Sequence, residues 1–116
     1  MTAPLRLLYV WDRMLPTSAT DAEQATSTMG ALSRRGVDVT LLLPRSPFGA
    51  GISAEAILSH YKVKGTIRVE HLSVPLASQL VVRKLGFAAR VALGAKLPPH
   101  DVAYTRNSAT FLALVA

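Results

Sequence analysis

The sequence contains no cysteine and few aromatic residues. Aromatics make up 6% of its 116 residues, and cysteine is absent. Disulfides, thiolate metal sites and cysteine nucleophiles are therefore excluded, which is compatible with the cytoplasm. The few aromatic residues fall mostly in predicted strands rather than on a surface where bases could stack, so the sequence disfavours nucleic acid as a partner.

Long hydrophobic runs are also missing. The first apolar stretch, Leu5 to Trp11, is interrupted by Arg6 and followed by Asp12 and Arg13, so it is too short for the core of a signal sequence. No segment approaches the roughly 18 uncharged apolar residues of a membrane span. The sequence therefore predicts a cytoplasmic protein without a transmembrane segment.

Acidic residues are scarce in the second half of the chain. The formal net charge is +6, and the residues through Tyr61 contribute none of it, because five bases there face five acids. From Lys62 onward, eight bases face only Glu70 and Asp101. Such an asymmetry indicates an anionic partner, which can be phosphate, nucleic acid or a membrane surface. The charge count alone does not choose among them.

What the chain does have is apolar material arranged as strand, helix and strand. Hydrophobic residues make up 50% of it, enough for the core of one small domain. The apolar run of residues 5–11 predicts a strand buried on both faces, and residues 37–43 predict a second strand. Between them a helix is predicted from a capping box, with Thr20 as the cap and Glu23 as its partner, to a glycine end at Gly36. Together these elements form a βαβ unit, which implies parallel strands.

The remaining predicted elements continue this alternation. In chain order they are a helix over residues 53–60, a strand over 67–72, a helix over 80–97, a strand over 102–105 and the start of a helix over 108–116. Pro44 is expected to end the second strand, and the alternating pattern of the third strand places it at a sheet edge. Because the chain ends inside an apolar segment, we expect a fragment of a longer α/β protein.

The order of elements predicts a Rossmann-like parallel sheet with helices on both faces, incomplete at the C-terminus. Its strand order is expected to be 3-2-1-4, and ligands of such sheets bind at the carboxyl ends of strands 1 and 4. The loops there carry hydroxyls, an amide, a carboxylate and two guanidiniums, which suit a polyhydroxylated or phosphorylated ligand. The candidate substrate-binding residues are Asp12, Arg13, Ser18, Thr20, Arg106 and Asn107. The helix start at Thr20 adds backbone N–H groups suited to an anion.

Catalytic and cofactor motifs are few. Residues 49–54 match the dinucleotide-binding fingerprint, with Glu70 near the spacing of a ribose contact, but the fingerprint needs its first glycine at a strand end and a loop intervenes here. His60, His71 and His100 lie too far apart in the sequence to form a ligand pair, and each is interpreted as an ordinary surface or half-buried histidine. The sequence therefore predicts neither a bound cofactor nor a metal, and it identifies no catalytic residue.

Four segments carry a further signal in their order and spacing. They are Leu7–Arg13, Ala31–Gly36, Val37–Pro44 and Asp101–Asn107. Together they resemble the N-terminal, acceptor-side domain of family 4 glycosyltransferases, and the resemblance covers nearly the whole chain. It implies the GT-B architecture of two Rossmann-like domains across a cleft, with the nucleotide-sugar donor held mainly by the second. Residues 1–116 are then a partial, truncated N-terminal domain.

The expected function is the acceptor-binding part of a glycosyltransferase that uses a nucleotide-sugar donor and a sugar or lipid-linked acceptor. The fragment alone is expected to be inactive. The alternative is a non-enzymatic module that binds phosphate, nucleic acid or a membrane surface through the basic second half. Within the predicted helix over residues 80–97, four bases and no acid indicate peripheral contact with the anionic inner face of a membrane. Its structural alternative is a helix buried between this domain and the missing remainder of the protein.

Overall fold

The computed structural model describes residues 4–11, 20–45, 52–73, 87–91 and 97–105 of the chain. They form β1 (Arg6–Val10), α1 (Thr20–Arg34), β2 (Asp38–Arg45), α2 (Ala54–His60), β3 (Ile67–Ser73) and β4 (Val102–Tyr104). Residues 87–91 add a helical turn. These elements confirm the predicted alternation of strand and helix over the described part of the chain.

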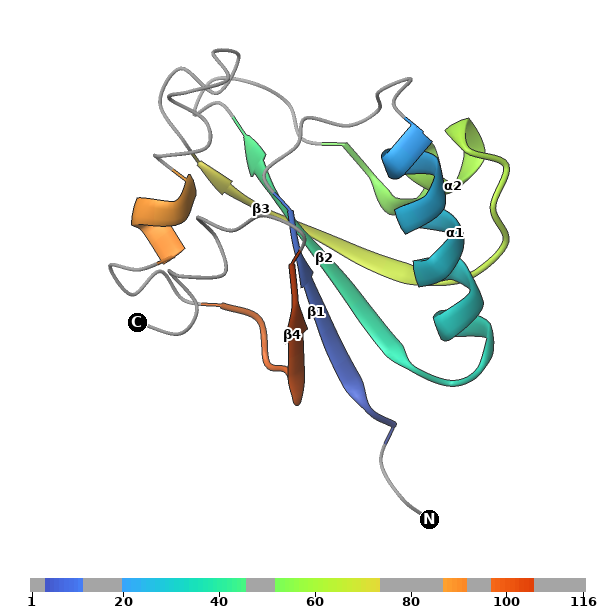
Figure 1. Ribbon diagram of the computed structural model, residues 1–116, viewed down its shortest axis with the longest axis horizontal. Coiled ribbons are helices and arrows are strands. Elements are labelled where there is room, and N and C mark those ends of the chain that lie inside the picture. The colour runs from blue at the N-terminus through green and yellow to red at the C-terminus, as the bar shows by residue number, and fades with distance from the viewer. Residues whose placement is uncertain (1–3, 12–19, 46–51, 74–86, 92–96, 106–116) are drawn as a thin grey trace.

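The four strands form one parallel sheet with the order β3-β2-β1-β4. This confirms the predicted order, in which β1, β2 and β3 step in one direction and the chain then crosses to the far side of β1. Figure 1 shows α1 and α2 on one side of the sheet and the helical turn of residues 87–91 on the other. As predicted, β3 lies at an edge of this sheet.

The larger core lies between the two helices and one face of the sheet. Helix α1 contributes Ala22, Ala25 and Met29 to it, at helical spacing. Thr26 is also fully buried on this helix, where its hydroxyl donates to the carbonyl oxygen of Ala22 at 2.8 Å. The bond removes the penalty of about 1–3 kcal/mol that an unsatisfied buried hydroxyl carries.

A smaller core covers the opposite face of the sheet. Its buried members are Leu8, Val10, Leu42, Leu72, Phe87 and Val91, and Leu97 packs against them. Phe87 is fully buried, whereas Arg90 on the same helical turn is exposed. The described turn therefore packs on the sheet through its apolar side, which both interpretations of this segment require, so the choice between them stays open. Residues 80–86 and 92–96 lie outside the described residues.

The predicted end of that helix is wrong. Leu97 has a non-helical backbone, although the helix was expected to include it. The following residue is Pro98, and the proline ring disfavours helical dihedrals in the residue before it. The helix must therefore end at least one residue before the position that the apolar pattern suggests.

The predicted end of the second strand is wrong as well. β2 continues through Pro44 to Arg45, and Pro44 is in register with Leu72 of β3. The carbonyl of Leu42 accepts from the N–H of Trp11 at 3.1 Å, so residue 44, two further along, also faces the β1 side. No residue of β1 pairs with Pro44 there. The N–H that proline lacks is therefore not needed for the ladder.

Helix α1 ends where the sequence predicts, but it begins one residue before the predicted first helical residue. The N–H of Gly36 donates to the Ser33 carbonyl and that of Val37 to the Leu32 carbonyl, both at 3.1 Å. Gly36 has a φ of 90°, the left-handed conformation that this Schellman ending requires. At the other end, Thr20 is itself the first helical residue, where the capping box placed it just outside the helix.

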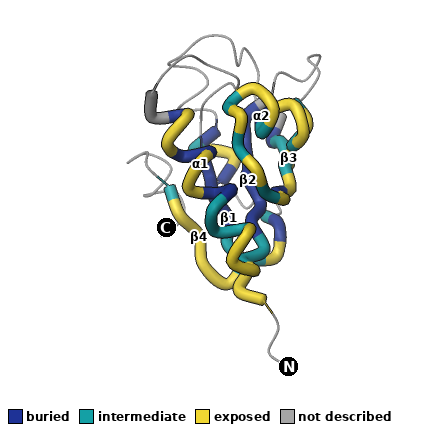
Figure 2. Tube along the Cα trace, turned by 90° about the vertical axis from the view of Figure 1, so that its right-hand side faces the viewer, coloured by how far each residue is buried: buried dark blue, intermediate teal, exposed yellow. Residues whose placement is uncertain are grey.

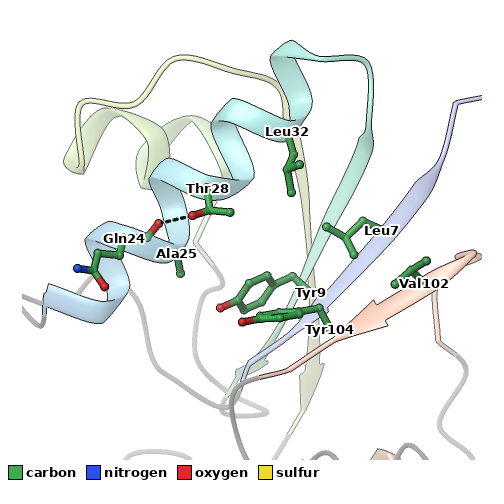
Figure 3. Close-up of a pocket in the computed structure, with 8 residues that line it drawn as sticks. All are labelled: Leu7, Tyr9, Gln24, Ala25, Thr28, Leu32, Val102 and Tyr104. Atoms are coloured by element: carbon green, nitrogen blue, oxygen red, sulfur yellow. Dashed lines mark hydrogen bonds between the residues drawn. The ribbon is translucent and has the colours of Figure 1, made fainter.

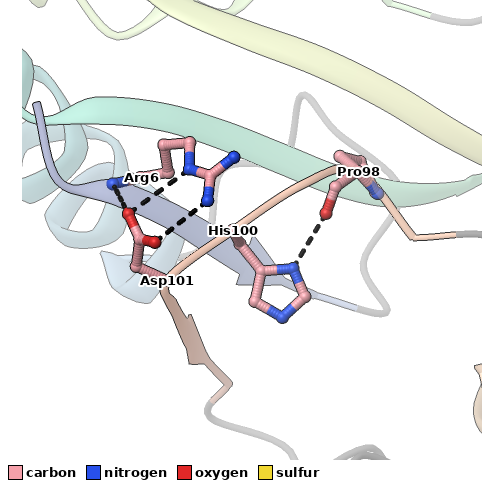
Figure 4. A network of polar contacts seen from close by, with 4 residues as sticks. All are labelled: Arg6, Pro98, His100 and Asp101. Atoms are coloured by element: carbon pink, nitrogen blue, oxygen red, sulfur yellow. Dashed lines mark hydrogen bonds and ion pairs between the residues drawn. The ribbon is translucent and has the colours of Figure 1, made fainter. Parts of the chain in front are cut away.

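An exposed ion pair joins β4 to β1 at the amino end of the sheet (Figure 4). The Arg6 guanidinium lies 3.0 Å from Asp101 Oδ1, and the backbone N–H of Arg6 donates to Asp101 Oδ2 at 2.8 Å. The Asp101 N–H in turn donates to the Arg6 carbonyl at 2.8 Å. The side-chain and backbone hydrogen bonds from Arg6 lower the pKa of the Asp101 carboxyl, and the same carboxylate raises the pKa of Arg6.

This ion pair predicts a loss of stability in acid. Because the pKa of Asp101 is lowered from 3.8 in the folded chain, its contribution is fully present above that value and is lost as the pH falls through the folded pKa. We expect Asp101→Asn to lower the midpoint of thermal unfolding at neutral pH and to flatten its acid dependence below about pH 4. The matched control is Glu70→Gln, which removes an exposed carboxylate outside the pair. Equal acid profiles for wild type and Asp101→Asn would contradict the prediction.

Candidate functional site

The carboxyl ends of β1 and β4 lie side by side. Tyr9 of β1 is in register with Tyr104 of β4, and the two strands are parallel, so the chain leaves both at the same end of the sheet. From β1 the chain proceeds to β2 on one side, while β4 lies on the other side. This divergence is the switch point at which Rossmann-like sheets bind ligands.

The predicted substrate-binding residues come directly after these strand ends or at the start of the next helix. Those that lie outside the described residues are Asp12, Arg13, Ser18, Arg106 and Asn107. Thr20 is the first residue of α1. The two segments that carry these residues leave adjacent parallel strands at the same edge, while the role of each residue stays a prediction.

An apolar groove lies beside the switch point (Figure 3). It encloses about 330 Å³ between α1 and the β1–β4 pair and is lined by Leu7, Tyr9, Gln24, Ala25, Thr28, Leu32, Val102 and Tyr104. Val102 and Tyr104 are 46% and 48% exposed, and Figure 2 shows β4 exposed along its length. The open side of the groove is therefore formed by β4. Its volume is at the small end of the range for ligand pockets, about 300–1,000 Å³.

Aromatic rings lead from this groove toward the strand ends. The ring centroids of Tyr9 and Tyr104 are 5.0 Å apart, and those of Tyr9 and Trp11 are 5.7 Å apart. Tyr9 and Trp11 are buried, so Tyr104 presents the most exposed of the three rings. In Figure 3 both tyrosine hydroxyls point toward the part of α1 that carries Gln24. The groove thus combines apolar walls with polar groups at one end.

Sequence reasoning did not predict this groove, because Tyr9 and Tyr104 were interpreted only as strand residues. The available signal was the expected order 3-2-1-4, which makes strands 1 and 4 neighbours. Placing the two rings on one face also needs the register of the pair, which the sequence pattern does not give. A one-residue shift would move Tyr104 to the other face of the sheet.

Two of the three histidines have structural hydrogen-bonding partners. Nε2 of His71 accepts the backbone N–H of Ile52 at 3.2 Å. Nδ1 of His100 lies 2.8 Å from the Pro98 carbonyl oxygen (Figure 4). Both side chains are also half-buried, which agrees with their interpretation as ordinary surface or half-buried histidines. Within the described ranges, no group of three or more histidine, aspartate or glutamate side chains is placed to hold a metal ion.

Glu70 is poorly placed for the dinucleotide fingerprint. The helix after the glycines, α2, begins at Ala54 and is capped by Ser53, whose hydroxyl accepts the Ala56 N–H at 3.1 Å. Helix α2 packs on the larger core, whereas Glu70 pairs with Leu42, whose side chain belongs to the smaller core on the other face. The carboxylate is therefore separated from α2 by the sheet.

No family model, no curated protein and no solved structure matches this chain. At the level of the fold the described residues are Rossmann-like, with their four parallel strands in the order 3-2-1-4. Among the helices of the described residues, none has the length and apolar character to cross a bilayer.

Proposed function

We propose that this chain is the N-terminal, acceptor-side domain of a nucleotide-sugar-dependent glycosyltransferase of the GT-B type. The observation that supports it best is the parallel pairing of β1 with β4, which creates a switch point flanked by the polar segments. The resemblance of the strand and helix-end motifs to family 4 glycosyltransferases adds the reaction class. In this proposal the acceptor binds at the carboxyl ends of β1 and β4, and a second domain holds the donor.

The predicted site residues suit a sugar acceptor. Sugar hydroxyls both donate and accept hydrogen bonds, which the carboxylate of Asp12 and the amide of Asn107 can satisfy. The guanidiniums of Arg13 and Arg106 can pair with phosphate oxygens in a phosphorylated or lipid-linked acceptor. No step of bond making is assigned to these residues, whose proposed role is to bind and orient the acceptor.

The apolar groove indicates that the proposed acceptor has an apolar part. Its walls are aliphatic and aromatic, and the half-exposed ring of Tyr104 lies at its open side. A glycoside with an aromatic or lipid aglycone could place the aglycone in the groove and the sugar over the crevice. The proposed substrate class is therefore a sugar attached to a hydrophobic group.

Titration with an aryl glycoside and with the same sugar lacking the aryl group tests this proposal. We expect the aryl glycoside to bind more tightly and to shift amide resonances of Leu7, Gln24 and Val102. Tyr104→Ala should weaken its binding by about fivefold, which corresponds to about 1 kcal/mol for an aromatic contact. Leu5→Ala is the matched control, because Leu5 is equally exposed, at 51%, but does not line the groove.

Two results would count against the proposal. If Tyr104→Ala binds the aryl glycoside as well as wild type does, the groove is not the aglycone site. If the chain does not bind glycosides but binds nucleic acid with an affinity that falls steeply with salt concentration, the non-enzymatic alternative is favoured.

A further inference from the structure

A second pocket lies between α1 and the loop that joins α2 to β3. It encloses about 340 Å³ and is lined by Ser27, Arg34, Lys62, Val63 and Lys64. Three of these side chains are cationic and none is acidic. Because α1 ends here and the loop leads into β3, the pocket lies toward the amino ends of the strands, away from the switch point of β1 and β4.

The loop that supplies the two lysines is packed tightly against α1. A Cβ atom added to Gly30 of α1 would lie 2.8 Å from the carbonyl oxygen of Lys64, and one added to Gly65 would lie 2.9 Å from Gly30 Cα. The guanidinium of Arg34 also donates to the Lys64 carbonyl. These contacts therefore fix the position of the backbone at Lys62 and Lys64 relative to the backbone of α1 at Arg34.

Lys62 occupies a position that favours glycine. Its N–H donates to the Ser59 carbonyl at 3.2 Å and the Val63 N–H donates to the Leu58 carbonyl at 2.9 Å, which is the same ending that α1 uses. In α1 the left-handed residue is Gly36, whereas α2 places Lys62 there with a φ of 55°. A lysine is strained in this conformation. Lys62 therefore supplies an ammonium group to the pocket at a position where glycine would stabilise the helix end better.

Carboxylates of the described residues do not neutralise these cations. Asp38 forms an ion pair with Arg68 at 3.2 Å, and Asp101 pairs with Arg6. Within the described part of the chain, Arg34, Lys62 and Lys64 form no ion pair. Cations gathered at one pocket repel one another, and an anion between them relieves that repulsion.

We propose that this pocket binds a phosphate-bearing anion, held by Arg34, Lys62, Lys64 and the hydroxyl of Ser27. Phosphate oxygens accept hydrogen bonds from guanidinium, ammonium and hydroxyl groups alike. The three positive charges of the pocket nearly balance the negative charge of a diphosphate. The site goes beyond the proposed glycosyl transfer, and because the two sites lie at opposite ends of the sheet, either can fail without the other.

Titration of the 116-residue chain with sodium pyrophosphate tests the site, with sodium chloride at equal ionic strength as the reference. We expect saturable shifts of the amide resonances of residues 27, 34 and 62–64. Lys64→Gln should weaken pyrophosphate binding by about fivefold, the effect of losing one exposed charge pair. Lys64→Arg keeps the positive charge and should retain most of the wild-type affinity. Absence of saturable shifts would overturn the proposal.

Lys62→Gly gives two readouts with opposite signs. Relief of the left-handed strain should raise the midpoint of thermal unfolding by about 2–5 °C, although glycine gains more freedom in the unfolded chain. Loss of the ammonium group should weaken pyrophosphate binding by about fivefold. Wild-type affinity in both Lys62→Gly and Lys64→Gln would overturn the site.

Arg35→Gln is the matched control. Arg35 is an exposed cation at the end of α1, so it shares with Arg34 the stabilising interaction with the helix dipole, but it does not line the pocket. We expect its replacement to change pyrophosphate affinity by less than about twofold. An effect as large as that of Lys64→Gln would show diffuse attraction to a basic surface and overturn the site.

Vesicles distinguish the two sources of phosphate. Phosphatidylcholine vesicles with and without phosphatidic acid are mixed with the chain and sedimented. If the chain binds only the vesicles with phosphatidic acid and pyrophosphate displaces it, the pocket binds a lipid headgroup. If the chain binds pyrophosphate but neither kind of vesicle, the phosphate belongs to a free anion. Both results support a phosphate site.

Discussion

Phe87→Ala should cost about 3–5 kcal/mol of the free energy of unfolding, the usual range for removing a fully buried phenyl ring. Phe87 has no exposed surface and packs in the smaller core with Leu8, Val10 and Leu42 of the sheet. These sheet residues are themselves buried, so the ring keeps water from the face that α1 and α2 do not cover. The loss is a large part of the roughly 5–15 kcal/mol that stabilises a typical domain.

Thermal or urea unfolding measures this cost. For a chain of this length we expect the midpoint of thermal unfolding to fall by about 12–20 °C. The matched control is Ala89→Ser, two residues along the same helical turn, where the side chain is exposed and the change should stay within about 0.5 kcal/mol. A Phe87→Ala midpoint within a few degrees of wild type would show that the ring does not hold the turn on the sheet.

The same variant bears on the expected contact with a membrane. The membrane hypothesis needs apolar side chains of residues 80–97 at a bilayer surface, and Phe87, Val91 and Leu97 cannot supply them because they pack against the sheet. A large destabilisation by Phe87→Ala would confirm this packing, but it would not distinguish a membrane from the remainder of the protein on the opposite side of the helix. The bases of the segment can still meet an anionic surface, and vesicle binding of Arg83→Gln, Lys84→Gln and Arg90→Gln tests that separately.

Strand positions and sheet order could be predicted because they depend on local patterns. Apolar runs of strand length, a capped helix ending at Gly36 and a later predicted strand at residues 102–105 leave few arrangements of a parallel sheet. The predicted order was confirmed in full. The error at Pro44 arose because proline was treated as a strand breaker, when its effect depends on whether a partner faces the missing N–H.

The candidate sites depended on contacts between distant segments, which the sequence pattern does not contain. The pairing of Tyr9 with Tyr104 needs the register of two strands separated by most of the chain. The left-handed conformation of Lys62 carries no composition signal, because glycine is the residue that marks such a helix end. The approach of Gly30 to the loop at Gly65 likewise requires knowledge of how the loop docks on α1. The pockets formed by these contacts could therefore not be predicted from the sequence.

Gly30→Ala should destabilise the fold, although alanine is the better helix former. In a free helix the substitution would gain about 1 kcal/mol. Here the added methyl group would lie 2.8 Å from the Lys64 carbonyl oxygen and would also strike the Val63 side chain. The first of these contacts is with backbone and cannot be relieved by a rotamer change. Overpacking of this kind costs about 1–3 kcal/mol, and two contacts this short belong to the upper part of that range, so we expect a net loss of about 1–2 kcal/mol.

A double-mutant cycle separates the two parts of that clash. Val63→Ala removes the side-chain contact, so Gly30→Ala should cost less in a Val63→Ala background, by about 0.5–1 kcal/mol, when measured by urea unfolding. The matched control is Gly36→Ala, whose added methyl group meets nothing within 4 Å but must adopt a φ of 90°. Its cost, about 1–2 kcal/mol, comes from conformation alone and should be unchanged by Val63→Ala. A stabilising Gly30→Ala, or equal coupling of both glycines to Val63, would show that the loop is not packed against α1 at this contact.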